Sequence, residues 1–185
     1  MKERSINTGK IGGIALRVTP SALATAVFFA GSASVLLYKV FKRRPWSAAA
    51  VGITVTAIHY LSDFWHHIGH ARAAERSGFP MEGVTFIGPL ARSDYPNNEG
   101  LLPAATHIQR ALGGPIFSLL LALASGLIMM LLRPLGGLPL SLAAFTFLDN
   151  LLVFTAGALM PLGFTDGSTV LHWWDQRQVR YHMRI

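Results

Sequence analysis

Residues 66–78 contain three histidines at close spacing: His66-His67-Ile68-Gly69-His70-Ala71-Arg72-Ala73-Ala74-Glu75-Arg76-Ser77-Gly78. If this stretch is helical, His66 and His70 lie four residues apart and present their imidazoles on one face. Two histidines at this spacing on a helix can bind one metal ion. Zinc accepts such nitrogen ligands and commonly takes a carboxylate as the third. The stretch therefore predicts a metal site with His66 and His70 as two of its ligands.

The composition around this stretch is that of a membrane protein. The chain has 185 residues, of which 51% are hydrophobic and 14% are charged, whereas soluble domains usually carry about 25% charged residues. A membrane helix needs about 20 mostly apolar residues. Four stretches satisfy this length, at residues 20–38, 46–70, 113–132 and 138–160. The sequence predicts four transmembrane helices, of which the second carries the histidines and becomes polar in its last third.

Charge and cysteine content narrow the classes of function. The chain has no cysteine, which excludes a disulfide framework, a thiolate metal site and a cysteine nucleophile. The net charge is +7, but the basic residues lie between apolar runs. Lipid headgroups are therefore the expected counter-charge, and we expect no nucleic-acid partner. The expected partners are membrane lipids and transmembrane segments of other proteins, as substrates or as complex partners.

The four predicted spans place residues 1–19, the connection 72–110 and residues 172–185 on one side of the membrane. These segments hold eleven of the sixteen Lys and Arg residues, against five on the other side. Cytoplasmic segments are enriched in Lys and Arg, so we expect a multi-pass protein of the cell (cytoplasmic) membrane with both termini in the cytoplasm. Residues 1–19 are then a cytoplasmic segment, and residues 172–185 are a basic tail at the membrane interface. Within the connection, residues 81–90 are rich in strand formers and predict a small hairpin.

A third metal ligand is expected after the fourth span. Pro161, Gly163 and Gly167 interrupt the helix around Asp166, and irregular backbone at membrane depth is tolerated where it lines a cavity. In the predicted topology, Asp166 and the histidine pair both lie at the cytoplasmic ends of their spans. The three side chains can therefore meet around one zinc ion. An ordinary turn or helix-cap role is the alternative for Asp166.

Further polar side chains lie inside the predicted spans. His59 and Asp63 precede the histidine pair on the second span, and Asp149 and Asn150 lie within the fourth. Ionisable groups at membrane depth are costly and usually face a protein interior or a wet cavity. We expect these residues beside the ligands or the cavity, with Asp63 orienting an imidazole. For Asp149 and Asn150 the alternative is a hydrogen-bonded contact between helices.

Three blocks of the sequence resemble the motifs of the site-2 protease family, the intramembrane zinc metalloproteases. Residues 66–78 are similar to the family's H-E-x-G-H-x-x-x-A helix and the start of the strand-rich loop after it. Residues 113–118, Gly-Gly-Pro-Ile-Phe-Ser, resemble the G-P-x-x-N start of the next helix. Residues 158–167, from Ala158 to Gly167, resemble N-x-x-P-x-x-x-x-D-G. The blocks occur in the family's order and lie within residues 46–171.

The resemblance implies an all-α integral membrane protein with a three-helix core and a small β-rich loop. It implies that His66, His70 and Asp166 are the metal ligands of a zinc site that activates water for peptide-bond hydrolysis. The chain departs from the family at the general base, where His67 replaces the usual Glu. Ser118 and Ala158 replace two asparagines of the family's motifs.

These departures point to a pseudoenzyme. General acid–base catalysis contributes about 10²–10⁴-fold to a rate, so the loss of the carboxylate at position 67 predicts an inactive or strongly impaired protease-like protein. Such a protein would act as a binding, regulatory or accessory subunit for membrane proteins. The first alternative is an active zinc endopeptidase that cleaves single-span membrane proteins, with His67 as an unusual base. The second is a membrane subunit that ligates haem or a pigment through its histidines. The sequence leaves open whether the chain is an enzyme.

Overall fold

The computed structural model describes residues 4–182, with side chains up to residue 176. Four strands are present: β1 (Ile6–Ile11), β2 (Ile14–Val18), β3 (Gly83–Ile87) and β4 (Leu90–Asp94). The helices are α1 (Pro20–Lys39), α2 (Pro45–Arg76), α3 (Ala104–Leu132), α4 (Gly137–Leu148) and α5 (Asp166–His182). A π-helical segment, η1 (Asp149–Gly157), continues α4 directly.

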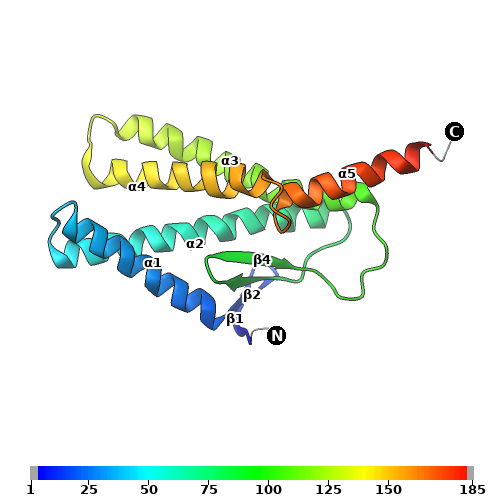
Figure 1. The fold of residues 1–185 in the computed structure, drawn as a ribbon, viewed down its shortest axis with the longest axis horizontal. Coiled ribbons are helices and arrows are strands. Elements are labelled where there is room, and N and C mark those ends of the chain that lie inside the picture. The colour runs from blue at the N-terminus through cyan, green and yellow to red at the C-terminus, as the bar shows by residue number, and fades with distance from the viewer. Residues whose placement is uncertain (1–3, 183–185) are drawn as a thin grey trace.

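The long helix α2 runs through the middle of the molecule, with α1 on one side and α3 and α4 on the other (Figure 1). The α1–α2 and α3–α4 turns lie at one end of the molecule, while the sheet and α5 lie at the other. Three helical stretches are long and apolar enough to cross a membrane: α1, α3 and the continuous helix from Gly137 to Gly157. The protein is thus mostly helical, with a small sheet at one end of a set of membrane-spanning helices.

Glycines bring the long helices into contact. A Cβ added at Gly52 of α2 would lie 2.3 Å from Oγ of Ser34 in α1. On the other side of α2, a Cβ at Gly69 would lie 2.3 Å from the carbonyl oxygen of Gly113 in α3. Small residues allow helix backbones to approach closely within a membrane. The second contact places the histidine-bearing end of α2 directly against α3.

The sheet joins two distant parts of the chain. Its strand order is β1-β2-β3-β4, with β2 and β3 parallel and the other neighbours antiparallel. The predicted hairpin forms as β3 and β4, with its turn at Gly88 and Pro89. The other two strands come from the segment expected to precede the first membrane helix, which carries no strand prediction. Strand β4 lies at the edge of the sheet and is paired with β3.

The predicted polar connection 72–110 is wrong at both ends. Helix α2 continues to Arg76, and α3 already begins at Ala104, nine residues before the predicted span. The extra turns are polar, and their buried polar side chains have partners within the protein: Arg110 is buried and pairs with Glu99. Helix α5 covers residues 166–182, so residues 183–185 of the predicted tail lie outside the described residues.

Candidate metal centre

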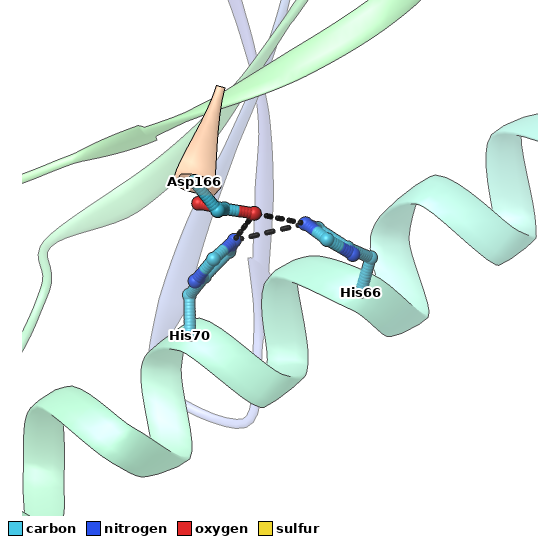
Figure 2. A group of neighbouring side chains, drawn as sticks. All are labelled: His66, His70 and Asp166. Atoms are coloured by element: carbon cyan, nitrogen blue, oxygen red, sulfur yellow. Dashed lines mark hydrogen bonds and ion pairs between the residues drawn. The ribbon is translucent and has the colours of Figure 1, made fainter. Parts of the chain in front are cut away.

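The three predicted ligands meet in one cluster (Figure 2). Nε2 of His66 is 3.2 Å from Oδ2 of Asp166, and Nε2 of His70 is 3.5 Å from the same oxygen. The two Nε2 atoms are 2.9 Å apart. A tetrahedral zinc site with ligand distances of about 2.0–2.1 Å has ligand–ligand edges of about 3.3 Å. The cluster therefore has the size and composition to hold a metal ion.

The Nδ1 atoms of both ligand histidines make hydrogen bonds, which leaves their Nε2 atoms to bind a metal ion. Nδ1 of His70 donates to the carbonyl oxygen of Arg110 at 2.8 Å, and Nδ1 of His66 lies 3.0 Å from the hydroxyl of Ser118. A neutral imidazole that donates through Nδ1 presents an unprotonated Nε2. When His66 likewise donates through Nδ1, to the Ser118 hydroxyl, two such lone pairs and the Asp166 carboxylate face one another at close range. A cation between them removes this repulsion, so the residues present fit a zinc ion.

The backbone of α3 forms the floor of the cluster. A Cβ added at Gly114 would lie 2.4 Å from Nε2 of His66 and 2.4 Å from Nε2 of His70. Such contacts are far inside van der Waals distance, so this position accommodates glycine alone without a shift of the ligands. Gly114 and Pro115 both lie in the buried part of α3, and Gly114 leaves room beside the two imidazoles.

Asp166 is delivered by the interrupted segment after η1. The turn from Pro161 to Thr165 is held by Thr165, whose hydroxyl donates to the carbonyl of Met160, and by Ser168, whose hydroxyl accepts from the Gly163 amide at 2.7 Å. A Cβ at Gly167 would lie 2.0 Å from the carbonyl oxygen of Leu159. The Pro and Gly residues of the motif therefore let the chain turn back so that Asp166, at the start of α5, points into the cluster.

Helix α5 is also fixed on α3 further along its length. The ring of Trp173 stacks on that of His107, with centroids 3.9 Å apart and an interplanar angle of 3°. This stack holds the helix that begins at Asp166 against the helix that carries Arg110 and Gly114.

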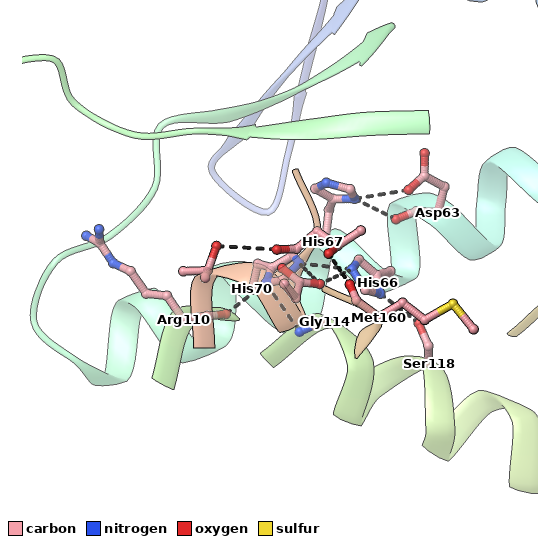
Figure 3. A network of polar contacts seen from close by, with 11 residues as sticks. Asp63, His66, His67, His70, Arg110, Gly114, Ser118 and Met160 are labelled. Atoms are coloured by element: carbon pink, nitrogen blue, oxygen red, sulfur yellow. Dashed lines mark hydrogen bonds and ion pairs between the residues drawn. The ribbon is translucent and has the colours of Figure 1, made fainter. Parts of the chain in front are cut away.

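His67, the residue at the base position, is held by Asp63 (Figure 3). Its Nδ1 donates to the main-chain oxygen of Asp63 at 2.9 Å and lies 3.2 Å from the Asp63 carboxylate. Both side chains are buried. The expectation that Asp63 orients an imidazole therefore corresponds to a contact with His67 rather than with a ligand histidine.

A cavity of about 550 Å³ adjoins the cluster. Residues of β4, including Leu90 and Ser93, form one wall of its lining, and residues of η1 and the turn after it, including Phe154 and Phe164, form another. The cluster and His67 line the cavity between these walls. The cavity thus brings an unpaired strand edge and the metal site together.

The carboxylates that line this cavity already have partners. Among the described residues they are Asp63, Glu99 and Asp166. Asp63 contacts His67, and Asp166 belongs to the metal cluster. Glu99 pairs with Arg110, whose Nη1 lies 2.9 Å from Oε2, and this hydrogen bond lowers the pKa of the Glu99 carboxyl. Each carboxylate of the described cavity therefore has at least one charged or imidazole partner, and Oδ2 of Asp63 is a buried oxygen without a hydrogen bond.

The structure corrects the placement of three predicted cavity residues. His59 contacts Asp149, and Asn150 donates to the hydroxyl of Ser62 at 2.9 Å. His59, Asp149 and Asn150 neither line the cavity nor join the metal cluster. The cause is distance along the helix: His59 lies seven residues before His66, which is about 10 Å of rise. Asp149 and Asn150 therefore make contacts between helices, the alternative stated for them, and His59 joins that contact.

Two features of the site have weak sequence signals. The π-helical segment η1 directs both Asp149 and Asn150 toward α2, and π-helical turns are rare and frequently occur at functional sites. Arg110 is buried, with Glu99, the ring of Tyr95 at 4.2 Å from its guanidinium carbon, and the carbonyl of Phe79 as neighbours. In the sequence, the buried position of Arg110 is indicated only by its place just before an apolar span. Its partners lie in other segments of the chain.

Comparison with solved structures shows which fold this is. The structure is similar to that of a site-2 protease from Methanocaldococcus jannaschii, with a TM-score of 0.62 over 91% of this chain and 70% of that one. The chain has a site-2 protease fold. The two sequences are 16% identical, so the likeness establishes the fold alone. None of the protein-family models and none of the curated proteins that were searched matches the sequence.

The site-2 protease fold confirms the resemblance found in the sequence motifs. The residues that carried it, His66, His70 and Asp166, occupy one cluster in that fold. His67, Ser118 and Ala158, the positions where the chain departs from the motifs, lie around the cluster: His67 and Ala158 line the cavity, and Ser118 contacts His66.

Proposed function

We propose that this chain is a zinc-binding, site-2-protease-like membrane protein that holds an extended segment of another membrane protein beside the zinc and cleaves it poorly or not at all. One observation carries the proposal. Three side chains that can hold a metal ion lie together, whereas position 67 holds a histidine and each carboxylate lining the described cavity already contacts a histidine or an arginine. Zinc bound there would supply Lewis-acid activation of water or of a carbonyl group. Among the described residues, position 67 has an imidazole in place of the carboxylate that would take up a proton beside the zinc.

The edge strand supports binding of an extended segment. Strand β4 pairs with β3 on one side, and its residues 90–93 line the cavity. The exposed edge of a sheet offers unpaired backbone groups to an added strand. A segment that pairs with this edge lies between β4 and η1, next to the metal cluster. Binding through backbone groups suits a subunit that engages membrane proteins as a regulator or accessory factor.

We further propose that four helices span the membrane, with α2 as the fourth. It has 32 residues and is thus about 48 Å long. It packs between α1 and α3, so its polar residues face protein rather than lipid. Both helix turns lie at one end and the sheet and α5 at the other (Figure 1). The Lys and Arg distribution places the sheet, the metal cluster and both termini on the cytoplasmic side.

A second candidate, an active zinc endopeptidase, is favoured by one contact. Because Asp63 engages Nδ1 of His67, Nε2 is the ring nitrogen left without a hydrogen-bond partner among the described residues. An imidazole held in this way on the cavity wall has the geometry to accept a proton. It differs from a glutamate in charge and reach, so the first proposal stands ahead of it.

A cleavage assay separates the two candidates. The chain, the His67→Glu variant and the His66→Ala variant are each reconstituted in liposomes with zinc and a reporter that has one transmembrane helix. We expect negligible cleavage by the natural sequence and a gain of about 10²–10⁴-fold in His67→Glu, the usual contribution of general acid–base catalysis. Cleavage by the natural sequence that is abolished in His66→Ala would overturn the proposal and establish the second candidate.

A further inference from the structure

His59 connects the two walls of the cavity without lining it. Its Nδ1 lies 3.1 Å from Oδ1 of Asp149, the first residue of η1. Its Nε2 lies 2.9 Å from the carbonyl oxygen of Pro89, in the turn that leads into β4. Because residues of η1 and of β4 line the cavity, one imidazole connects η1 with the turn that leads into β4.

The bridge requires two protons, one on Nε2 of His59 and one between Nδ1 and Asp149. The Pro89 carbonyl oxygen can only accept, so Nε2 of His59 must be protonated to make that contact. The contact between Nδ1 and Asp149 then needs a second proton, carried either by the imidazole or by the carboxyl group. Both arrangements have the same proton count. When this proton is lost, a lone pair of Nδ1 faces a carboxylate, and one of the two contacts breaks.

The groups around His59 come from every element packed on it. Helix α1 contributes the ring of Phe29, at a centroid distance of 5.7 Å, and η1 contributes Phe154 as well as Asp149. On α2 itself, Asp63 lies one turn away and acts on His59 through its charge, and Tyr60 is its neighbour. Asp149 and Asp63 are therefore the carboxylates to be considered when the bridge takes up or loses its proton.

The tip of the hairpin has a second set of anchors that carry no charge. The hydroxyl of Tyr60 donates to the carbonyl oxygen of Gly88 at 2.8 Å, and the amide of Gly88 donates to the hydroxyl of Ser21 at 3.2 Å. These contacts hold the hairpin to α1 and α2 but do not reach η1. His59 contacts both the hairpin, at the Pro89 carbonyl oxygen, and η1, at Asp149.

We propose that His59 is a positioning residue: while it holds its proton, it ties the β3–β4 hairpin to η1 and sets the separation between the two walls of the cavity. Loss of the proton releases one wall, so the width of the cavity depends on pH. The proposal rests on the proposed function, because a segment held between β4 and η1 is aligned with the metal cluster only when these walls are in register.

The test is a distance measurement across the cavity. The chain has no cysteine, so the pair Leu90→Cys and Leu152→Cys, at exposed positions of β4 and η1, accepts two spin labels without further changes. Pulsed electron paramagnetic resonance at pH 5 and pH 9 then reports the separation of the walls. We expect a narrow distance distribution at pH 5 that becomes broader and longer at pH 9.

Two variants in the labelled background make the measurement decisive. His59→Gln keeps one amide donor but has no proton to lose, so its distribution should be the same at both pH values. Tyr60→Phe removes an uncharged anchor, so it should broaden the distribution at both pH values and keep the pH dependence. An unchanged distribution in the natural sequence between pH 5 and pH 9, or an equal pH dependence in His59→Gln, would overturn the proposal.

Zinc content of the same labelled samples, measured at pH 7.5, distinguishes this proposal from the proposed function. We expect His59→Gln to retain the zinc stoichiometry of the natural sequence, because His59 does not touch the cluster. Absence of zinc from all samples together with a pH-dependent distance would leave the bridge standing and reject the proposed function. Bound zinc with a pH-independent distance would reject the bridge.

Discussion

Close backbone contacts position the three ligands His66, His70 and Asp166, whereas a side-chain and main-chain contact with a single residue positions His67. On the ligand side, Gly114 and Gly167 sit where a Cβ would lie 2.4 Å and 2.0 Å from neighbouring atoms. On the other side, His67 is positioned by one residue of its own helix, Asp63. Metal binding and metal use are therefore separable in this fold: the helix crossing determines whether the ligands meet, and the side chain at position 67 determines whether a base lies beside them.

The largest effect is expected from breaking the ligand side at Gly114. The change Gly114→Ala places a methyl group 2.4 Å from Nε2 of both His66 and His70, so at least one imidazole must move. We expect zinc affinity to fall by about 100-fold or more, the upper end of what residues around a metal site contribute. The measurement is a competition titration with a chromophoric chelator.

The matched control for this change is Gly31→Ala in α1. A Cβ at Gly31 meets nothing within 4 Å, so this variant has the same chemical change in a membrane helix without the contact. Equal zinc affinity in Gly114→Ala and Gly31→Ala would show that the metal site does not depend on the close approach of α3.

A smaller effect is expected at the hydrogen bond behind His66. The change Ser118→Ala removes the hydroxyl that lies 3.0 Å from Nδ1 of His66, so the ring is less firmly oriented. Zinc affinity should fall about 10-fold, the lower end for such a partner. Ser125→Ala is the control, since Ser125 is buried on the same helix and donates to carbonyls of that helix. If both variants lose affinity equally, the orientation of His66 is not the cause.

The smallest effect, on the stability of the fold, is expected at the ion pair of Glu99 and Arg110, two residues that line the cavity. Because the hydrogen bond from Arg110 lowers the pKa of Glu99, the ion pair stabilises the fold fully above the ordinary pKa of glutamate. This contribution is lost as the pH falls through the lowered pKa. The change Glu99→Gln should cost about 1 kcal/mol at pH 7, the usual net value of a hydrogen bond. The difference from the natural sequence should shrink on acidification to pH 3.

Thermal unfolding of both proteins across this pH range checks the prediction. Glu75→Gln is the control, because the Glu75–Arg72 pair is exposed and such pairs contribute about 0–1 kcal/mol. A difference between Glu99→Gln and the natural sequence that grows toward pH 3 would contradict the sign of the effect.

The parts of the site that the sequence predicted are those set by local chemistry. His66 and His70 share a face because of helix geometry. The proline and glycines around Asp166 predict an interrupted helix. Neither inference needs a distant partner. The site-2-protease resemblance then combined these local patterns into one fold, and the similarity of the structure confirms that fold.

The parts that the sequence did not predict depend on contacts between distant residues. Strand β2 pairs with β3 across the whole of α1 and α2, and the pattern of residues 6–18 does not reveal that partner. The π-helical turn directs Asp149 toward His59. The period of about 3.6 residues in apolar positions, which predicts a helix from the sequence, does not distinguish a π-helical turn from an α-helical one. The neighbours of Arg110 likewise come from two separate loops.

The central claim is that the chain holds one zinc ion through His66, His70 and Asp166. The most direct test is elemental analysis of the detergent-purified protein beside its His66→Ala variant. We expect about one zinc per chain in the natural sequence and loss of that zinc in the variant, because the ion would keep two of its three protein ligands. No zinc in the natural sequence after zinc is supplied, or equal zinc in both proteins, would contradict it.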